Sequence, residues 1–340
     1  MVDLVTSAEI ADAFAGIRDV VRTTPVLPCS ALPSRTPLLL KAEHTQLLGS
    51  FKIRGALHAV KAAGKRARRA GVVAFSSGNH GKAVAYAAKA LGVAATIVMP
   101  VTAPAVKVEA VRALGATVHL VEPEKRETHP KELGERTGAV VIHPFDSREV
   151  IAGHGSIGLE LLDQVPGLGT VLVPVSGGGL ISGVAAAVKA RRPGVRVIGV
   201  EPELAADAAE SHRLGRLVAW PEEDTGRTMA DGLRADRLGE LPWDHIRMLV
   251  DEIVTVSEEE IADTLRQLAM AAKQLVEPSG AVAAAAMVHR RAALPAGGAT
   301  VAILSGGNVA PGLAARVLAG GPDRPAEPAR PAASRGVATS

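Results

Sequence analysis

The stretch HTQLLGSFKIRGALHAV, residues 44–60, places a lysine where a helix is expected to begin. A helix N-terminus carries partial positive charge from its free N–H groups, so a cation is disfavoured there. Ser50 is positioned to cap the same helix, which sharpens the conflict. We therefore interpret Lys52 as a lysine that is held as an imine or tuned as a base.

Short runs of β-branched and aliphatic residues alternate with alanine-rich helical segments along the chain. Helical patterns are clearest at residues 82–91 and 181–192. This alternation predicts an α/β fold in which parallel sheets are flanked by helices on both faces. The expected strands cover residues 37–42, 72–75, 96–99, 117–120, 140–143, 171–175, 195–200 and 300–305.

The sequence indicates the strands more clearly than it indicates the domain boundaries. Residues 70–147 form compact units and are expected to make a small domain, whereas 1–69 and 148–320 make a larger, discontinuous one. A cleft between two such lobes is the default place for a small-molecule ligand. Residues 321–340 are rich in Pro, Ala and Arg and predict a disordered tail.

Composition excludes several classes of function. The chain has 340 residues and a net charge of +3, without a basic run interleaved with aromatic residues, so no nucleic-acid partner is expected. No apolar run approaches the roughly 20 residues of a membrane span, and the N-terminus is unlike a signal peptide. With Cys29 as its only cysteine the chain cannot form an intrachain disulfide, which suits a cytoplasmic protein.

Two strand-to-helix turns carry groups that bind anions. FSSGNHGKAVAYAAK, residues 75–89, offers serine and asparagine side chains at a helix start, which suits a carboxylate; an ordinary capped turn is the alternative. VLVPVSGGGLISG, residues 171–183, can surround one phosphate with backbone N–H groups; a flexible turn is the alternative. Ser182 replaces a glycine of the dinucleotide fingerprint, which disfavours a nicotinamide-dependent dehydrogenase.

A third strand exit, VAILSGGNVAPG at residues 301–312, ends on Ser305 and two glycines. A lysine, a phosphate cradle, a carboxylate cradle and a hydroxyl at a strand end together fit one ligand, pyridoxal phosphate. Lys52 would hold its aldehyde, residues 177–179 its phosphate, and Asn79 its ring hydroxyl.

The motifs SFKIRGA, SSGNHG, SGGGL and SGGN together resemble the fold-type II pyridoxal-phosphate enzymes. Within them the chain is most similar to the serine racemase and serine/threonine dehydratase group, from about residue 7 to residue 318. The resemblance implies a tryptophan synthase β-like two-domain fold and a homodimer. It also implies β-elimination of water from L-threonine or L-serine, with a 2-oxo acid and ammonia as products.

The resemblance assigns roles around the cofactor. Lys52 matches the Schiff-base lysine that also moves the Cα proton, while Phe51 and Gly232 match residues at the two faces of the ring. Ser305 matches a neutral partner of the ring nitrogen, which favours elimination over transamination. The implied cofactor-binding set is Phe51, Lys52, Asn79, Ser176, Gly177, Gly178, Gly179, Leu180, Gly232 and Ser305.

The resemblance also implies a substrate site with two alternatives to plain dehydration. Ser77 matches a serine of the racemase-like members, and a proton donor on each face is what serine racemisation needs. Arg126 matches a substrate-side arginine that can clamp the second carboxylate of threo-3-hydroxyaspartate, although a solvated helix start explains it equally well. The implied substrate-binding set is Ser76, Ser77, Gly78, Asn79, His80 and Arg126.

A divalent-cation site is implied by the same resemblance. Glu201, Asp207 and the carbonyl of Ala205 match its ligands, and oxygen ligands suit Mg²⁺ or Ca²⁺; an acidic surface loop is the alternative. Three departures from the family pattern leave the substrate and the racemase activity open, namely Leu48 for a threonine, His154 for a glutamine and Ala235 for a serine. The intact lysine and serines speak against a non-catalytic binding protein.

Overall fold

The computed structural model describes residues 3–32, 38–293 and 297–320. The first residue of the strand predicted at 37–42 and the whole tail predicted at 321–340 lie outside the described residues. Within the described part no helix has the length and apolarity needed to cross a membrane.

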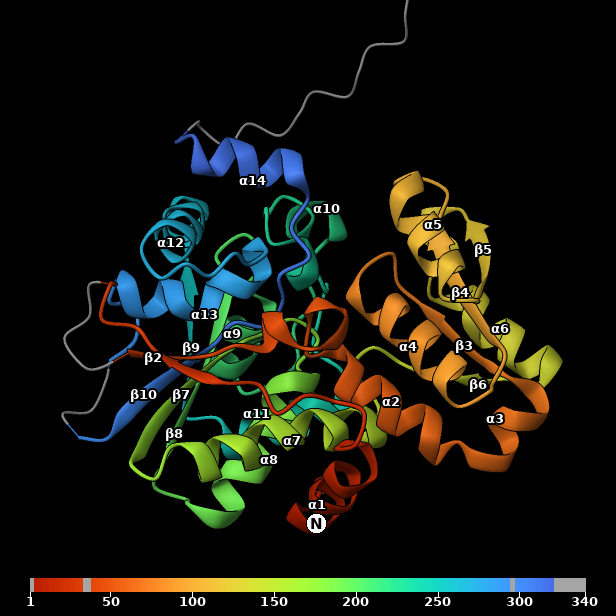
Figure 1. Ribbon diagram of the computed structural model, residues 1–340, viewed down its shortest axis with the longest axis horizontal. Helices are drawn as coiled ribbons and strands as arrows, with labels where there is room; N and C mark the ends of the chain where they lie inside the picture. Colours follow the sequence, from red (N-terminus) through yellow and green to blue (C-terminus); the bar gives the residue numbers. More distant parts are fainter. Residues whose placement is uncertain (1–2, 33–37, 294–296, 321–340) are drawn as a thin grey trace, which may run out of the picture.

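Two sheets organise these residues (Figure 1). The six-stranded sheet has the order β1-β2-β10-β7-β8-β9, and the four-stranded sheet has the order β5-β4-β3-β6. Only the β1–β2 pairing is antiparallel among the described strands, so the predicted parallel α/β class is confirmed. The strands are β1 (Val26–Pro28), β2 (Leu38–Lys41), β3 (Val72–Phe75), β4 (Ala95–Pro100), β5 (Thr117–Val121), β6 (Val140–Val141), β7 (Leu168–Pro174), β8 (Arg196–Pro202), β9 (Glu252–Val256) and β10 (Ala299–Ile303).

Helices connect and cover the strands. The α-helices are α1 (Ser7–Ile17), α2 (Lys52–Ala62), α3 (Gly64–Ala70), α4 (Asn79–Ala90), α5 (Ala105–Ala113), α6 (Thr128–Thr137), α7 (Arg148–Gln164), α8 (Gly179–Arg191), α9 (Asp207–Leu214), α10 (Glu222–Thr225), α11 (Glu240–Leu249), α12 (Glu258–Met270), α13 (Pro278–Val288) and α14 (Pro311–Leu318). Short 3₁₀ turns are η1 (Glu43–Thr45), η2 (Leu47–Gly49), η3 (Pro123–Lys125) and η4 (Asp231–Leu233).

The six-stranded sheet is buried on both faces, as its apolar strands predict. Leu172 of β7 belongs to the core cluster with α12 and α13, whereas its neighbours Val171 and Val173 belong to the cluster with α7, α8 and α11. Successive side chains of a strand point to opposite faces, so a run of apolar residues is needed to fill both. The pattern missed β1 and β9, which are short edge strands with half-buried residues.

We call β3–β6 with α4–α6 the small lobe and the residues around the six-stranded sheet the large lobe. They lie on opposite sides of α2, which contacts α4 of the small lobe and α7 of the large lobe (Figure 1). The boundaries predicted after residues 69 and 147 remain a prediction. Because α2 begins with Lys52, this packing places the lysine at the junction of the lobes.

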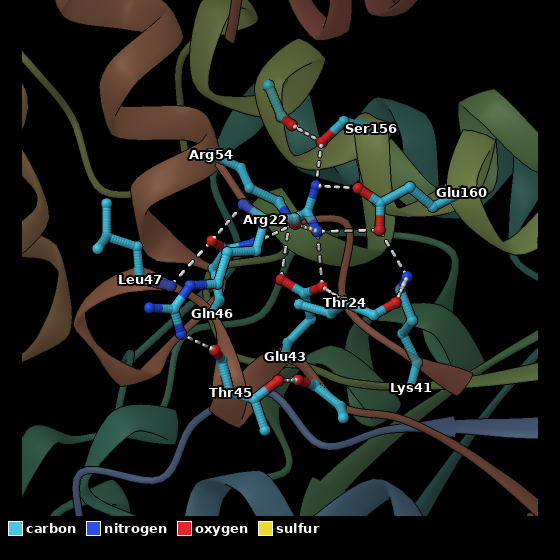
Figure 2. A network of polar contacts seen from close by, with 12 residues as sticks. Arg22, Thr24, Lys41, Glu43, Thr45, Gln46, Leu47, Arg54, Ser156 and Glu160 are labelled. Carbon is cyan, nitrogen blue, oxygen red and sulfur yellow. Dashed lines mark hydrogen bonds and ion pairs between the residues drawn. The ribbon is translucent and has the colours of Figure 1, made fainter. Parts of the chain in front are cut away.

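A buried charge cluster fixes α2 to the large lobe (Figure 2). It consists of Lys41, Glu43, Arg54 and Glu160, which come from β2, η1, α2 and α7 and are almost wholly buried. Arg54 binds Glu43 at 2.8 Å and Glu160 at 2.7 Å, and Lys41 binds Glu160 at 2.6 Å. Buried charges are tolerated when they are paired and hydrogen-bonded, and here two cations meet two carboxylates.

Candidate active site

A pocket of about 310 Å³ lies where the two lobes meet, and the three strand-to-helix turns line it. It brings together every residue predicted to bind the cofactor or the substrate, from Phe51 in sequence order to Ser305. The predicted cation ligands lie elsewhere. The structure therefore provides the proximity that the prediction requires, while the role of each residue remains a prediction.

Lys52 is the first residue of α2, and its Nζ donates a hydrogen bond to the carbonyl of Pro144 at 3.0 Å. No carboxylate pairs with it among the described residues, and burial lowers the pKa of Lys52 to about 8. The predicted Ser50 cap is wrong, because Phe51 holds the N-cap position without a side-chain bond. Ser50 is buried and its backbone forms a bridge with Gly306 instead.

The loop of three glycines leads into α8 and leaves the helix start open. No side chain caps α8, so its first N–H groups remain free for an anion. Gly178 has φ of 90°, a left-handed conformation that favours glycine. A Cβ on Gly177 would lie 2.3 Å from the ring of Phe145, which explains the need for glycine there. This cradle fits a single phosphate group.

Asn79 is held by two residues from distant parts of the chain. Its Nδ2 donates to Glu277 at 2.7 Å, and its Oδ1 accepts from Asn308 Nδ2 at 2.8 Å. Burial, followed by the charge of Asp231, raises the pKa of Glu277 to about 7. The sequence analysis assigns no role to Glu277, or to Asn308, which is the asparagine of the SGGN motif.

Ser279 connects two predicted cofactor residues and was also missed. Ser305 Oγ donates to the carbonyl of Ser279 at 3.3 Å, and the Gly232 N–H donates to Ser279 Oγ at 2.9 Å. Ser176 Oγ accepts a bond from the N–H of Ala235 at 3.2 Å. Ser279 lies in the stretch VEPSGA, residues 276–281, but only the fold shows that it lies beside Ser305 and Gly232.

Three histidines lie close enough to Lys52 to be affected by its charge, and two of them, His80 and His154, are buried. Burial lowers the pKa of His80 to about 3 and that of His143 to about 4, and it holds the pKa of His154 well below its usual value. Nε2 of His80 bonds the carbonyl of Ile142 at 2.9 Å, whereas its buried Nδ1 has no hydrogen-bond partner among the described residues. His154 packs edge-on against Phe51, with ring centroids 4.7 Å apart.

Arg126 lines the mouth of the pocket and is already paired. Its Nη2 lies 2.8 Å from Glu222 Oε1 of α10 and 3.9 Å from Glu127 Oε1. A second pair joins Lys107 of α5 to Asp231 of η4 at 3.2 Å. Both pairs cross from the small lobe to the large lobe.

The predicted cation ligands Glu201 and Asp207 lie at the end of β8 and the start of α9, and both are buried. Burial raises the pKa of Asp207 to about 8; burial and the charge of Asp207 raise that of Glu201 well above its usual value. Among the described residues no three His, Cys, Asp or Glu side chains gather to hold a metal. The predicted set has two carboxylates and one carbonyl, so Mg²⁺ or Ca²⁺ remains a prediction.

Known proteins resemble this chain over most of its length. It is 42% identical over 308 residues to a serine racemase of Oryza sativa subsp. indica, covering 88% of this chain and 90% of that one. It is 40% identical over 326 residues to an L-threo-3-hydroxyaspartate ammonia-lyase of Saccharomyces cerevisiae, covering 94% and 98%. The solved structure of maize serine racemase superposes with a TM-score of 0.87 at 40% identity, covering 94% of this chain and 98% of that one. A solved threonine deaminase superposes with a TM-score of 0.84 at 44% identity, covering 90% and 99%.

A family model described as pyridoxal-phosphate dependent enzyme matches residues 17–306. The lysine with a lowered pKa, the uncapped glycine-rich helix start and the buried hydroxyl of Ser305 all suit that cofactor. The chain therefore belongs to the pyridoxal-phosphate-dependent enzymes of fold type II.

Proposed function

We propose that the chain is a lyase that eliminates water from a β-hydroxy amino acid, with L-threonine and L-serine as leading substrates. The products are a 2-oxo acid and ammonia. The observation that carries this proposal is the pairing, in one pocket, of Lys52 with a pKa of about 8 and the open glycine-rich start of α8. A threonine deaminase and a serine racemase among the similar proteins support it.

Pyridoxal phosphate, when bound, withdraws electrons from the Cα of an attached amino acid and so makes the Cα proton removable. The glycine loop would hold its phosphate, and Ser305 its ring nitrogen. Asn79, fixed by Glu277 and Asn308, would hold the ring hydroxyl. The turn at residues 76–80 would bind the substrate carboxylate with the free N–H groups of α4.

Lys52 would have two tasks, tethering the cofactor aldehyde and taking the Cα proton. A general base works best when its pKa lies near the working pH, and burial brings Lys52 close to that range. Burial lowers the pKa of His80 and of His154, so these two rings add no positive charge near Lys52 at neutral pH.

Two further activities have an observation in their favour. Arg126 lines the pocket and would bind the second carboxylate of threo-3-hydroxyaspartate, the substrate named for the yeast relative. Ser77 lines the same pocket and would serve as the second proton donor for racemisation of serine. The family match leaves the nicotinamide-dehydrogenase and non-catalytic alternatives without support.

The setting of the enzyme is also inferred from the family resemblance. We expect a homodimer in the cytoplasm. We also expect Mg²⁺ or Ca²⁺ at Glu201 and Asp207, where the buried Asp207 Oδ2 has no hydrogen-bond partner among the described residues.

A spectrum and a product assay test the proposal. The purified chain should absorb in the visible when supplied with pyridoxal phosphate, and borohydride should fix the cofactor at Lys52. Release of 2-oxo acid from L-threonine, L-serine and threo-3-hydroxyaspartate, with chiral analysis of the remaining serine, ranks the three activities. A colourless protein, or one that turns over none of these substrates, contradicts the proposed function.

A further inference from the structure

The two ion pairs at the pocket mouth differ in where their carboxylates lie. Lys107 and its partner Asp231 both line the pocket. Arg126 lines the pocket as well, together with Glu127, which lies 3.9 Å from its Nη2, but its nearer partner Glu222 is not among the lining residues. Glu222 therefore binds Arg126 from outside the pocket lining, as part of the large lobe, while Arg126 itself lines the pocket.

The guanidinium of Arg126 is the group that a second substrate carboxylate would seek. An arginine offers a planar fork that matches a carboxylate, but Glu222 already occupies its Nη2 at 2.8 Å. A carboxylate that binds this fork with two parallel hydrogen bonds must share that nitrogen with Glu222 or displace Glu222. Displacement is feasible, because the side chains of Arg126 and Glu222 are 37% and 62% exposed and exposed ion pairs are weak.

We infer that Glu222 is a specificity-determining residue that competes with the second carboxylate of a dicarboxylic β-hydroxy amino acid for Arg126. A monocarboxylic substrate such as L-serine has no group that needs this arginine, so it escapes the competition. The pair thus favours monocarboxylic substrates in the unmodified chain. This inference rests on the proposed function of the pocket.

The test removes the charge of Glu222 and compares the effect on kcat/KM with that of removing the charge of a neighbouring glutamate. Glu223 is exposed on the same helix and forms no hydrogen bond or ion pair among the described residues, so Glu223→Gln changes net charge equally. Glu222→Gln should raise kcat/KM for threo-3-hydroxyaspartate about two- to fivefold, the range of an exposed ion pair. It should leave L-serine and L-threonine unchanged, and Glu223→Gln should leave all three unchanged.

A double-variant comparison tests whether the effect passes through Arg126. In an Arg126→Gln background the additional change Glu222→Gln should have no effect on any substrate. Calorimetric binding of succinate, with butyrate as the monocarboxylic control, provides a readout that needs no turnover. Glu222→Gln should tighten succinate binding by the same factor and leave butyrate unchanged.

The inference is overturned by any of four results: no change in Glu222→Gln, an equal change in Glu223→Gln, an equal change for both substrate classes, or a change that persists without Arg126. Failure of the proposed function looks different. In that case the unmodified chain turns over none of the substrates, while the succinate measurement still shows whether Glu222 competes for Arg126.

Discussion

Lys52 and Arg54 lie two residues apart on α2, carry the same charge, and have opposite surroundings. Arg54 points into the buried charge cluster, where Glu43 and Glu160 outweigh the effect of burial and hold its pKa above the usual value (Figure 2). Lys52 points into the pocket, has no carboxylate partner among the described residues, and loses proton affinity through burial. One cation is fixed and the other is free to lose its proton.

The contrast between Arg54 and Lys52 shows that a cation taken out of solvent can have a structural or a chemical role, depending on its partners. A charge with partners fixes the position of a helix, because removing either partner leaves the other unpaired in a region of low dielectric. A lysine without partners is destabilised as an ammonium and becomes a nucleophile or a base. Helix α2 combines both, so the cluster around Arg54 fixes the helix that carries Lys52.

The largest expected effect is on the free cation. Lys52→Arg keeps the positive charge but cannot lose a proton near neutral pH, so the tether and the base are both lost. We expect kcat to fall at least about ten-thousandfold, or about 5 kcal/mol, while the melting temperature changes little. Steady-state assays with L-threonine and thermal melts check this. Activity above about one per cent of the unmodified enzyme, a loss of less than about 3 kcal/mol, would contradict the role of Lys52.

The next effect is on the fixed cation. Glu160→Gln leaves Lys41 and Arg54 with one buried carboxylate, and we expect a loss of about 3–5 kcal/mol in the free energy of unfolding. Urea denaturation measures it. Asp163→Asn, an exposed change on the same helix with no ion pair among the described residues, should cost under about 0.5 kcal/mol and serves as the control. Equal effects of the two changes would mean that the cluster does not hold α2.

The cluster should also respond to acid. Burial alone would raise the pKa of Glu43, but Arg54 holds it below the usual 4.5. A carboxylate with a depressed pKa contributes stability above its unfolded pKa and loses it as the pH falls through the folded pKa. The difference in stability between the unmodified chain and Glu43→Gln should therefore be constant above about pH 5 and shrink below about pH 4.

The reactivity of Lys52 should change with pH in the alkaline range instead. With a pKa of about 8 rather than 10.5, about one tenth of Lys52 side chains are unprotonated at about pH 7. Reaction of the cofactor-free protein with trinitrobenzenesulfonate, measured at Lys52 by peptide mapping, should rise with pH to a midpoint near about 8. A midpoint near about 10 would show that the lysine is solvated. Lys65 of α3, which does not line the pocket, is mapped in the same experiment for comparison.

The smallest effect is expected at an exposed ion pair. Arg112 and Glu109 are 2.7 Å apart on α5, with 49% and 66% of their side chains exposed. Glu109→Gln should change the free energy of unfolding by about 0.3–0.5 kcal/mol, because solvent already stabilises both charges. A loss comparable to that of Glu160→Gln would remove the distinction between buried and exposed pairs.

The sequence by itself determined the parallel α/β class and the turns that carry the site. Apolar strands, glycine-rich turns and the position of Lys52 are local patterns, and local patterns predict local structure. It failed where the partners are distant: the predicted Ser50 cap is wrong, and Asn308 and Ser279 have no predicted role. The place of Lys52 at a helix start predicts a tuned lysine, but no local pattern predicts that Arg54, two residues on, is paired with Glu43 and Glu160. Only the tertiary structure decided that, because a side chain's pKa depends on what burial removes and on which charges the fold brings within a few ångströms.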